Sequence, residues 1–512
     1  MGYLMGIDIG TSGTKTVLFD INGGTVGSAF EEYSMSQPRP GWAEQDPEDW
    51  WRAVRDSIRR VLQEAHVAPK EVLGLGLSGQ MHGAVLLDED YQVLRPSIIW
   101  CDQRSSLQCE WIEDKIGKER LIELTCNPAL TGFTAPKVLW VRDNEPDIFH
   151  KTRKILLPKD YIRFRLTGEL ASEVSDASGT LFFDVKKRKW STEVLSELGI
   201  EREMLPEVFE SPEVSGKIIA KAAQETGLAV GTPVVGGGGD QAAGAVGNGI
   251  VEPGIISSTI GTSGVVFAFS NEVKMDPKGR VHTFCHAVPG KWHVMGVTQG
   301  AGLSYRWFRD NFAISEIEVG RATGIDPYEL LGKEAERVAS GCEGLIFLPY
   351  LMGERTPHLD PDAKGVFFGL TPRHTRSHVI RSIMEGVTYS LRDSLEILKE
   401  LKIPVKQIRA SGGGARSQLW RQMQADIFNS EIVTINAKEG PAFGVALLAG
   451  VGTGVYNSVE EACSATIKTV TRLEPVSENL KRYDDYYNIY RDLYGALKTH
   501  FGRVTEVVDK YI

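Results

Sequence analysis

The feature that most constrains the fold is a pentapeptide that occurs twice. Ile-Gly-Thr-Ser-Gly stands at residues 9–13 and again at residues 260–264, once in each half of the 512-residue chain. Each copy lies between short apolar runs that are typical of strands. Because a strand–turn–strand unit recurs, we predict two α/β domains of related design, one over residues 1–248 and one over residues 249–512.

Other segments fill in this α/β pattern. A third strand is predicted in "TVGSAFEEY", and a helix begins after Asp46, a favourable N-cap residue that is followed by Pro47. Apolar residues recur at helical spacing from Trp50 to Ala65, which indicates a buried helix face. Further predicted elements are a strand at 71–79, a pair of strands within 83–100, a long amphipathic helix at 377–401, a strand at 405–415 and a helix at 416–429.

Composition excludes several classes of partner. The net charge of -10 argues against a general nucleic-acid or anionic-membrane binder, because such a surface repels phosphate backbones. The six cysteines are scattered without a CxxC pair, which is typical of reduced thiols. The N-terminus enters a strand directly, and the longest uncharged apolar stretch, residues 441–455, is shorter than the ~18 residues of a membrane span. We therefore expect a cytoplasmic protein.

Two familiar patterns do not support the functions that they usually indicate. Residues 74–79 match GxGxxG, but a predicted turn and strand follow where a dinucleotide site needs a helix. A zinc site could be imagined from His282, Cys285, His286 and His293, but their spacing fits no common zinc motif. Neither a dinucleotide site nor a zinc site is predicted.

The twin turns are candidate phosphate sites. A tight bend of small residues presents backbone N–H groups and hydroxyls that bind phosphate oxygens. Asp8 precedes the first turn, and its carboxylate would repel phosphate unless Mg²⁺ or its water shell lies between them. Lys15 follows this turn and could add a positive charge. A plain hairpin explains either copy alone equally well. Two copies, only one of which is preceded by an Asp, favour the interpretation that the two turns bind different phosphates of one polyphosphate ligand.

Two glycine-rich segments follow predicted strands. In "VVGGGGDQAAG", Asp240 would project at the carboxyl end of a strand, where open α/β sheets bind ligands. Alternatively, Asp240 caps the small-residue helix that follows. The glycines in "IRASGGGARSQLW" could admit an adenine or a phosphate at a helix N-terminus, or could form a simple strand–helix turn.

The loop "SGQMHG" is a candidate substrate site. Gln80 and His82 offer hydrogen-bonding groups and Met81 an adaptable apolar wall, a combination that suits a polyhydroxylated substrate. A turn that carries a surface histidine is the alternative.

Together these segments resemble the FGGY family of carbohydrate kinases, and within it the kinases of D-xylulose. "GIDIGTSGTK", "WAEQDP", "SGQMHGAVLLD", "GGGGDQAAGAVGNG", "STIGTSGV", "FLPYLMGERTPH" and "SGGGARSQLWRQMQADI" follow the family's order. Residues 132–144 and 365–385 resemble its signature patterns, and the similarity extends from residue 3 to about residue 490. The resemblance implies two ribonuclease-H-like domains, as in actin and hexokinase, with the active site in a cleft between them.

The resemblance also implies an ATP- and Mg²⁺-dependent reaction that makes D-xylulose 5-phosphate. Asp240 would be the general base, an ordinary ionised aspartate, and Asp8 would hold Mg²⁺, through water. The implied phosphate and nucleotide contacts are Thr11, Ser12, Lys15, Thr262, Gly302, Gly413 and Gly414. The implied sugar contacts are Met81, His82, Trp100 and Gln241.

Two departures bear on the choice of sugar. Relatives that act on D-xylulose can carry Asn at the positions of Gln241 and Cys101. Another FGGY kinase, acting on ribulose or a different polyol, therefore stays open, as does an actin-like scaffold or chaperone ATPase. The expected partners are the two small-molecule substrates, with neither nucleic acid nor membrane, and a homodimer is left open.

Overall fold

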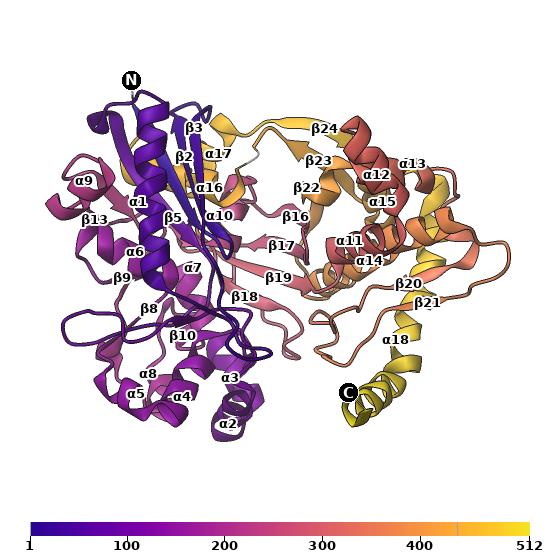
Figure 1. Cartoon of the computed structure of the whole chain (residues 1–512), viewed down its shortest axis with the longest axis horizontal. Coiled ribbons are helices and arrows are strands. Elements are labelled where there is room, and N and C mark those ends of the chain that lie inside the picture. Colours follow the sequence, from indigo (N-terminus) through magenta and orange to yellow (C-terminus); the bar gives the residue numbers. More distant parts are fainter. Residues whose placement is uncertain (1, 438, 512) are drawn as a thin grey trace. The chain divides into compact units, whose positions relative to one another are not determined.

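The structure, a computed structural model, describes residues 2–437 and 439–511 (Figure 1). These residues form two compact units. Unit 1 holds the chain up to Glu252 together with Phe269–His293 and Ala437–Lys468. Unit 2 holds Pro253–Ala268, Val294–Asn436 and the chain from Thr469 onward.

The first sheet has the strand order β13-β14-β5-β1-β2-β3, and β15 also pairs with β5. The strands β1, β2 and β3 are antiparallel neighbours, whereas β5 runs parallel to β1 and β14 runs parallel to β5. Their bounds are β1 Tyr3–Ile9, β2 Gly13–Asp20, β3 Thr25–Glu32, β5 Val72–Gly79, β13 Val214–Lys217, β14 Pro233–Val235 and β15 Gly238–Gly239. The strands predicted around the first pentapeptide are confirmed.

The second sheet repeats this connectivity, with the order β18-β19-β17-β16-β22-β23-β24. An antiparallel hairpin, β16–β17, is again followed by strands parallel to its first member, here β22 and β23. The bounds are β16 Gly254–Ile260, β17 Gly264–Ser270, β18 His282–Cys285, β19 Trp292–Thr298, β22 Val405–Gly412, β23 Glu431–Ile435 and β24 Thr469–Leu473. The predicted pair of ribonuclease-H-like α/β domains is therefore confirmed.

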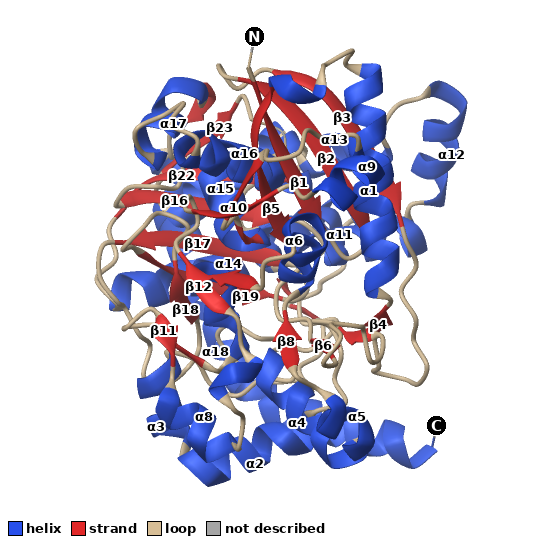
Figure 2. Cartoon of the chain, turned by 90° about the vertical axis from the view of Figure 1, so that its left-hand side faces the viewer, coloured by secondary structure: helices blue, strands red, loops and turns tan. Residues whose placement is uncertain are grey.

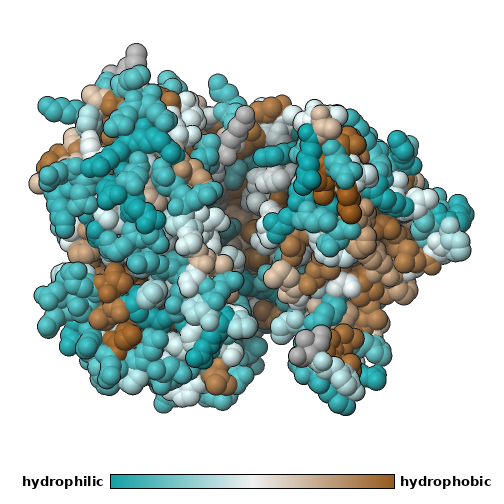
Figure 3. Space-filling model, in the orientation of Figure 1, coloured by the Kyte–Doolittle hydropathy of each residue, from teal (hydrophilic) through white to brown (hydrophobic). Residues whose placement is uncertain are grey.

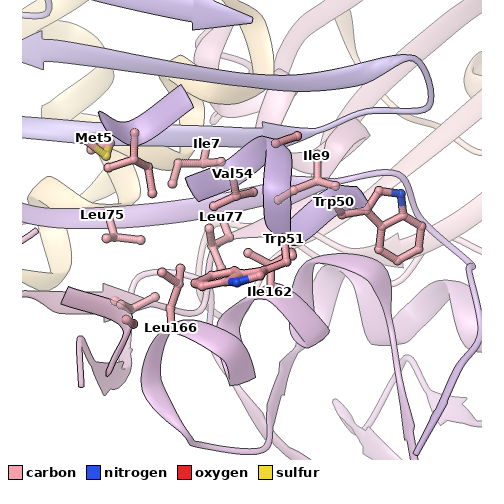
Figure 4. Packing of buried hydrophobic residues seen from close by; sticks show 14 of the residues in the cluster. Met5, Ile7, Ile9, Trp50, Trp51, Val54, Leu75, Leu77, Ile162 and Leu166 are labelled. Carbon is pink, nitrogen blue, oxygen red and sulfur yellow. The ribbon is translucent and has the colours of Figure 1, made fainter. Parts of the chain in front are cut away.

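Helix α1 (Pro47–Glu64) covers one face of the first sheet (Figure 2). The Asp46 carboxylate accepts the N–H of Glu48 at 2.9 Å, so the predicted cap forms. Trp50 and Trp51 are buried against strand residues such as Leu77 in one apolar cluster (Figure 4). The outer face of this helix is hydrophilic (Figure 3), as its periodicity requires.

Helix α16 (Gly440–Gly452) lies against β1, β5 and α10 (Asp240–Gly247), because glycines leave room for its backbone. A Cβ added to Gly6 would lie 1.8 Å from the carbonyl oxygen of Ala442, and one added to Gly76 would lie 2.2 Å from that of Val445. The GxG spacing in β5 therefore serves helix packing. This packing also places residues 437–468 in unit 1, which a division by chain order does not anticipate.

In the second half, the two predicted helices are confirmed as α14 (Arg376–Glu400) and α15 (Gln418–Phe428). The predicted pair of strands within residues 83–100 is present, and isolated antiparallel bridges join Ala84 to Ile98 and Leu87 to Val93. The two short strands there, β6 (Val85–Leu87) and β7 (Ser97–Ile98), pair with β8 (Lys154–Leu156) and β4 (Glu44–Gln45). Such short strands take their partners from distant segments, which local spacing cannot reveal.

The remaining elements connect these layers. The other helices are α2 Ser106–Ile116, α3 Lys118–Thr125, α4 Thr134–Asn144, α5 Pro146–Lys151, α6 Pro158–Thr167, α7 Val174–Ala177, α8 Thr192–Leu198, α9 Ala220–Thr226, α11 Ala301–Phe312, α12 Ile314–Thr323, α13 Pro327–Ala335, α17 Val459–Thr466 and α18 Ser477–Tyr511. The other strands are β9 Ala171–Glu173, β10 Phe183–Asp184, β11 Lys189–Trp190, β12 Glu207–Phe209, β20 Ile346–Leu348 and β21 Val366–Phe368. Across residues 2–437 and 439–511, no helix combines the length and apolar character that a membrane crossing needs.

Candidate active site

Three parallel strands of unit 1 end at one edge of the first sheet. In the register of the sheet, Gly79 of β5 lies beside both Ile9 of β1 and Gly239 of β15. The N–H of Gln80 donates to the carbonyl of Ile9 at 2.8 Å, which holds the next residues together. The first turn, the "SGQMHG" loop and Asp240 therefore leave the sheet side by side, as expected for residues at the carboxyl ends of parallel strands.

Asp240 does not serve as a helix cap. The N-cap of α10 is Gly239, which has no side chain to donate or accept, and Asp240 is the first residue of the helix. The alternative interpretation of Asp240 as an N-cap is therefore wrong. Its carboxylate is half-buried at the sheet edge.

The pKa values of both aspartates at this edge are raised. Burial, and then the charge of Asp8, raise the pKa of Asp240 to about 7, although contacts with Gln241 oppose the shift. Burial raises the pKa of Asp8 to about 6, against the lowering effects of Ser78 and Lys15. The expectation of an ordinary aspartate at position 240 is therefore wrong, because two carboxyl groups share a poorly solvated edge.

The first turn is held by side chains from other segments. Gln45 Nε2 donates to the carbonyl of Thr11 at 2.7 Å, and Tyr33 Oη donates to the carbonyl of Gly10 at 2.5 Å. Trp100 Nε1 donates to Thr11 Oγ1 at 2.9 Å. Trp100 was predicted to contact the sugar, but the only hydrogen-bond donor of its side chain is used on the first turn. Sequence reasoning missed Gln45 and Tyr33, although Gln45 lies in the quoted "WAEQDP" motif.

Of the other residues predicted at this turn, Ser12 is exposed and Lys15 is partly exposed. Lys15 Nζ forms an ion pair with a carboxylate oxygen of Glu439. Sequence reasoning missed this partner, because Glu439 comes from a segment that joins unit 1 only in the folded chain.

The predicted sugar pair is held by Gly239, the residue before the predicted base, and by Gly179. Met81 is buried, and its Cγ would be 2.9 Å from a Cβ added to Gly239, the residue before Asp240. His82 adopts a φ of 71°, and its Nδ1 donates to the carbonyl of Gly179 at 2.7 Å. The His82 ring also packs on Phe133, with ring centroids 4.8 Å apart. Backbone and aromatic contacts thus fix the imidazole.

The second turn, in unit 2, is held by the first residues of α11. The N–H groups of Gly302 and Leu303 donate to the carbonyls of Gly261 and Thr262 at 2.9 and 3.0 Å. A Cβ at Gly302 would lie 2.2 Å from the Gly261 carbonyl oxygen, so this close approach requires glycine.

A cavity of about 430 Å³ opens beside this turn within unit 2. It brings together four predicted nucleotide contacts, which are Thr262, Gly302, Gly413 and Gly414. The other lining residues are Ile260, Gly261, Tyr305, Arg306, Arg309, Asp326, Tyr328, Arg416, Ser417 and Trp420. The glycines here form a 3-10 turn, Gly413–Arg416, and α15 begins only after its N-cap Ser417.

Sequence reasoning missed the aromatic wall of this cavity. The rings of Tyr305 and Tyr328 are stacked with centroids 5.2 Å apart, and Trp420 meets Tyr305 edge-on at 5.3 Å. The guanidinium of Arg309 lies 4.9 Å from the centroid of Tyr328. Flat apolar faces with nearby arginines suit a heterocycle that carries phosphates. Tyr328 lies between predicted elements, where no periodic signal indicated it.

Comparisons with known proteins cover almost the whole chain. The N-terminal domain model of the FGGY family of carbohydrate kinases matches residues 3–247, and its C-terminal domain model matches residues 256–453. A xylulose kinase of Bacillus subtilis (strain 168) is 40% identical, covering 97% of this chain and 98% of that protein. A xylulose kinase of Escherichia coli (strain K12) is 41% identical, covering 96% and 99%.

Solved structures agree with these relatives. The crystal structure of a ligand-bound xylulose kinase from Lactobacillus acidophilus has a TM-score of 0.91 and 28% identity to this chain. The match covers 98% of this chain and 100% of that one.

Proposed function

The chain belongs to the FGGY family of carbohydrate kinases, and we propose that it transfers the γ-phosphoryl group of ATP to D-xylulose, making D-xylulose 5-phosphate. The observation that carries this proposal is that Met81 lies directly against Gly239, the residue before Asp240, while the neighbouring His82 is fixed by the carbonyl of Gly179. A sugar held by this pair has a carboxylate next to it that can receive a proton. An actin-like scaffold has no use for such a pair.

Asp240 acts as the general base. It accepts the proton of the sugar hydroxyl as that oxygen bonds to the γ-phosphorus and the bond to the bridging oxygen of ADP breaks. The transition state of phosphoryl transfer is loose, so the carboxylate mainly orients the hydroxyl and takes the proton late. A pKa near 7 makes Asp240 a stronger base than an ordinary aspartate, while it is still largely ionised above neutral pH.

Asp8 fits the magnesium side of the site. Its Oδ1 is buried and has no hydrogen-bond partner among the described residues, which suits an oxygen that accepts from the water shell of a cation. Within residues 2–437 and 439–511, no group of three or more His, Cys, Asp or Glu side chains is placed to hold a metal directly. Mg²⁺ bound through water would supply charge neutralisation for the phosphates, with Asp8 as its anchor.

The two turns and the cavity each contact a different part of the nucleotide. The N–H groups of the first turn and the Thr11 hydroxyl hold the transferring phosphate, and the second turn holds the inner phosphates. The stacked pair Tyr305 and Tyr328 offers the adenine a flat surface in the cavity that Gly413 and Gly414 also line.

A sugar panel tests the proposal. ADP release is measured with D-xylulose, D-ribulose, L-ribulose, glycerol, gluconate and no sugar, each with ATP and Mg²⁺. We expect the highest kcat/KM for D-xylulose, at least about tenfold above the others, because a hydrogen-bonding pocket penalises a misplaced hydroxyl by that much or more. A higher kcat/KM for another sugar would move the proposal to that substrate. ATP turnover that no sugar changes would overturn kinase activity itself.

Two further expectations stay predictions. The free state of all six cysteines supports a reducing compartment, in line with the cytoplasm. The homodimer is tested by light scattering of the purified chain.

A further inference from the structure

A buried segment of unit 1, residues 173–180, contacts both the residue before Asp240 and the Met81–His82 pair. It comprises Glu173, the short helix α7 and the 3-10 turn Ser178–Thr180. None of its residues was predicted to belong to the site. Its side chains are fully or almost fully buried, and Glu173 and the hydroxyls of the segment find hydrogen-bond partners within the protein. The Asp176 carboxylate has no hydrogen-bond partner among the described residues and lies 3.4 Å from Lys159 Nζ.

The Glu173 side chain is held in place by several hydrogen bonds. Its carboxylate accepts the N–H groups of Ser175 and Asp176, each at 2.8 Å, and the hydroxyl of Ser211 at 2.9 Å. Lys159 Nζ lies 3.7 Å from the same carboxylate, and its positive charge is shared with the closer carboxylates of Asp160 and Asp176. With these partners a buried carboxylate is held in one orientation.

Ser175 connects the Glu173 carboxylate to the strand that ends at the base. Its hydroxyl donates to Glu173 Oε1 at 2.7 Å. Because the only hydroxyl proton is committed to the carboxylate, the oxygen presents its lone pairs elsewhere, and it accepts the N–H of Gly239 at 3.1 Å. Gly239 directly precedes Asp240, so this bond fixes the Gly238–Gly239 peptide, one residue before the Cα from which the carboxylate projects.

The other end of the segment holds the sugar pair. The carbonyl of Gly179 accepts from His82 Nδ1 at 2.7 Å. A Cβ at Gly179 would lie 2.6 Å from that nitrogen and 3.2 Å from the Met81 methyl group, so the segment lies directly against both side chains. One rigid segment thus contacts the residue before Asp240 and the pair that would bind the sugar.

We propose that Ser175 is a positioning residue for the kinase reaction. Through its bond to Gly239 it sets the distance between the Asp240 carboxylate and the sugar hydroxyl, and Glu173 holds Ser175 in place. The proposal rests on the proposed function, and it adds a residue that touches neither substrate.

The test compares Ser175→Ala with two matched controls. Ser211→Ala removes another hydroxyl from the same Glu173 carboxylate, and Ser178→Ala removes a hydroxyl of the same segment that accepts from the N–H of Cys285 instead of Gly239. We expect kcat of Ser175→Ala to fall about tenfold to a hundredfold, with KM for D-xylulose and for ATP within about twofold of the unmodified protein. Both controls should retain kcat within about threefold.

A second variant guards against misfolding. Ser175→Cys fills the same space with a weaker acceptor, and we expect it to fold and to lose part of kcat. If kcat of both Ser175 variants matches that of Ser211→Ala, or if KM rises as kcat falls, the positioning role is overturned. If the unmodified protein does not phosphorylate D-xylulose, the proposed function fails instead, so the two failures are distinguishable.

Discussion

The two copies of Ile-Gly-Thr-Ser-Gly have the same sequence but not the same turn. In the first, four residues separate the last registered pair, Ile9 and Thr14. In the second, three residues separate Ile260 and Gly264. The register of the second hairpin is therefore shifted by one residue, although the turn sequences are identical.

The supports of the two turns explain how one sequence can adopt both forms. Side-chain donors from Gln45, Tyr33 and Trp100 hold the first turn, whereas backbone N–H groups at the start of α11 hold the second. Identical small residues accept either arrangement because glycines flank each turn. The surroundings of the turn decide its geometry.

The charges differ as well. Asp8 lies across from Lys15 in the first hairpin, and the matching positions of the second hairpin hold Thr259 and Val266. Thr259 Oγ1 is within 2.6 Å of Ser411 Oγ. Under the proposed function, the first turn would therefore need a cation to offset the charge of Asp8 when it binds phosphate, whereas the second turn would contact phosphate with neutral groups.

Asp8→Asn removes the charge that distinguishes the first turn from the second, and it should have the largest effect on the reaction rate. Removing the charge that anchors the cation should lower kcat by about a hundredfold to a thousandfold, while D-xylulose still binds. Steady-state rates at saturating ATP and Mg²⁺ measure the loss. Thr259→Val changes the matching position of the second turn and should cost less than about fivefold. A rate for Asp8→Asn within tenfold of the unmodified protein would remove Asp8 from its proposed role.

Much of the fold follows from local patterns, as these turns illustrate. Alternation and turn residues place β1, β2, β16 and β17 correctly, and Asp46 marks the start of α1. The shifted register could not be predicted, because it depends on Gln45 and on α11, which are distant in sequence from the turns. That residues 437–468 belong to unit 1 could not be predicted either, because it depends on contacts with segments distant in sequence.

The candidate site divides in the same way. Asp8 and Asp240 could be predicted as candidates because each follows or precedes a predicted strand end or turn, whereas Gly302 was implied only by the family resemblance. Tyr305 and Tyr328 could not, because an aromatic wall has no fixed spacing along the chain. The raised pKa of Asp240 was also missed, since it arises from burial and from a neighbour on another strand.

Gly302→Ala tests the support of the second turn. The added Cβ would meet the Gly261 carbonyl at 2.2 Å, so either the turn or α11 must move. We expect KM for ATP to rise about tenfold to thirtyfold, while the affinity for D-xylulose stays unchanged. Initial rates at varied ATP and isothermal titration with D-xylulose separate the two effects. Gly332→Ala, where nothing lies within 4 Å of an added Cβ, is the matched control. Equal KM values for the two variants would contradict the role given to this close approach.

The carboxyl pair beside the first turn should also limit stability. The pKa of Asp8 is raised to about 6 and that of Asp240 to about 7, so the folded state holds protons that the unfolded state loses near pH 4. Stability therefore falls as pH rises from about 4 to 7, and the penalty is complete above pH 7.

Asp8→Asn and Asp240→Asn remove this penalty and should each raise Tm at pH 8 by roughly 2–4 °C, with a smaller gain at pH 5. Thermal scans between pH 5 and 8 measure the trend. Glu64→Gln, which removes a carboxylate from the exposed face of α1, is the control for the loss of one negative charge. A gain that is independent of pH would show that titration is not its cause.

The smallest expected effect on the reaction is that of changing Trp100, for which the sequence and the structure indicate different roles. The resemblance places its side chain in the sugar pocket, whereas its indole N–H donates to Thr11 Oγ1. Because that hydroxyl accepts from the indole, its own proton is left to point at the transferring phosphate. Trp100→Phe keeps a ring but removes the donor, and kcat/KM for ATP should fall about fivefold, the value of one typical hydrogen bond.

The double variant with Thr11→Val decides between the two duties. If Trp100 acts through Thr11, Trp100→Phe should cost nothing further once the hydroxyl is gone, a coupling that additive effects cannot produce. If Trp100 instead contacts the sugar, Trp100→Phe should raise KM for D-xylulose and leave KM for ATP unchanged, whether or not Thr11 is present. The first result would show that the indole supports the first turn through its side chain. The second turn has its support from backbone N–H groups of α11 instead.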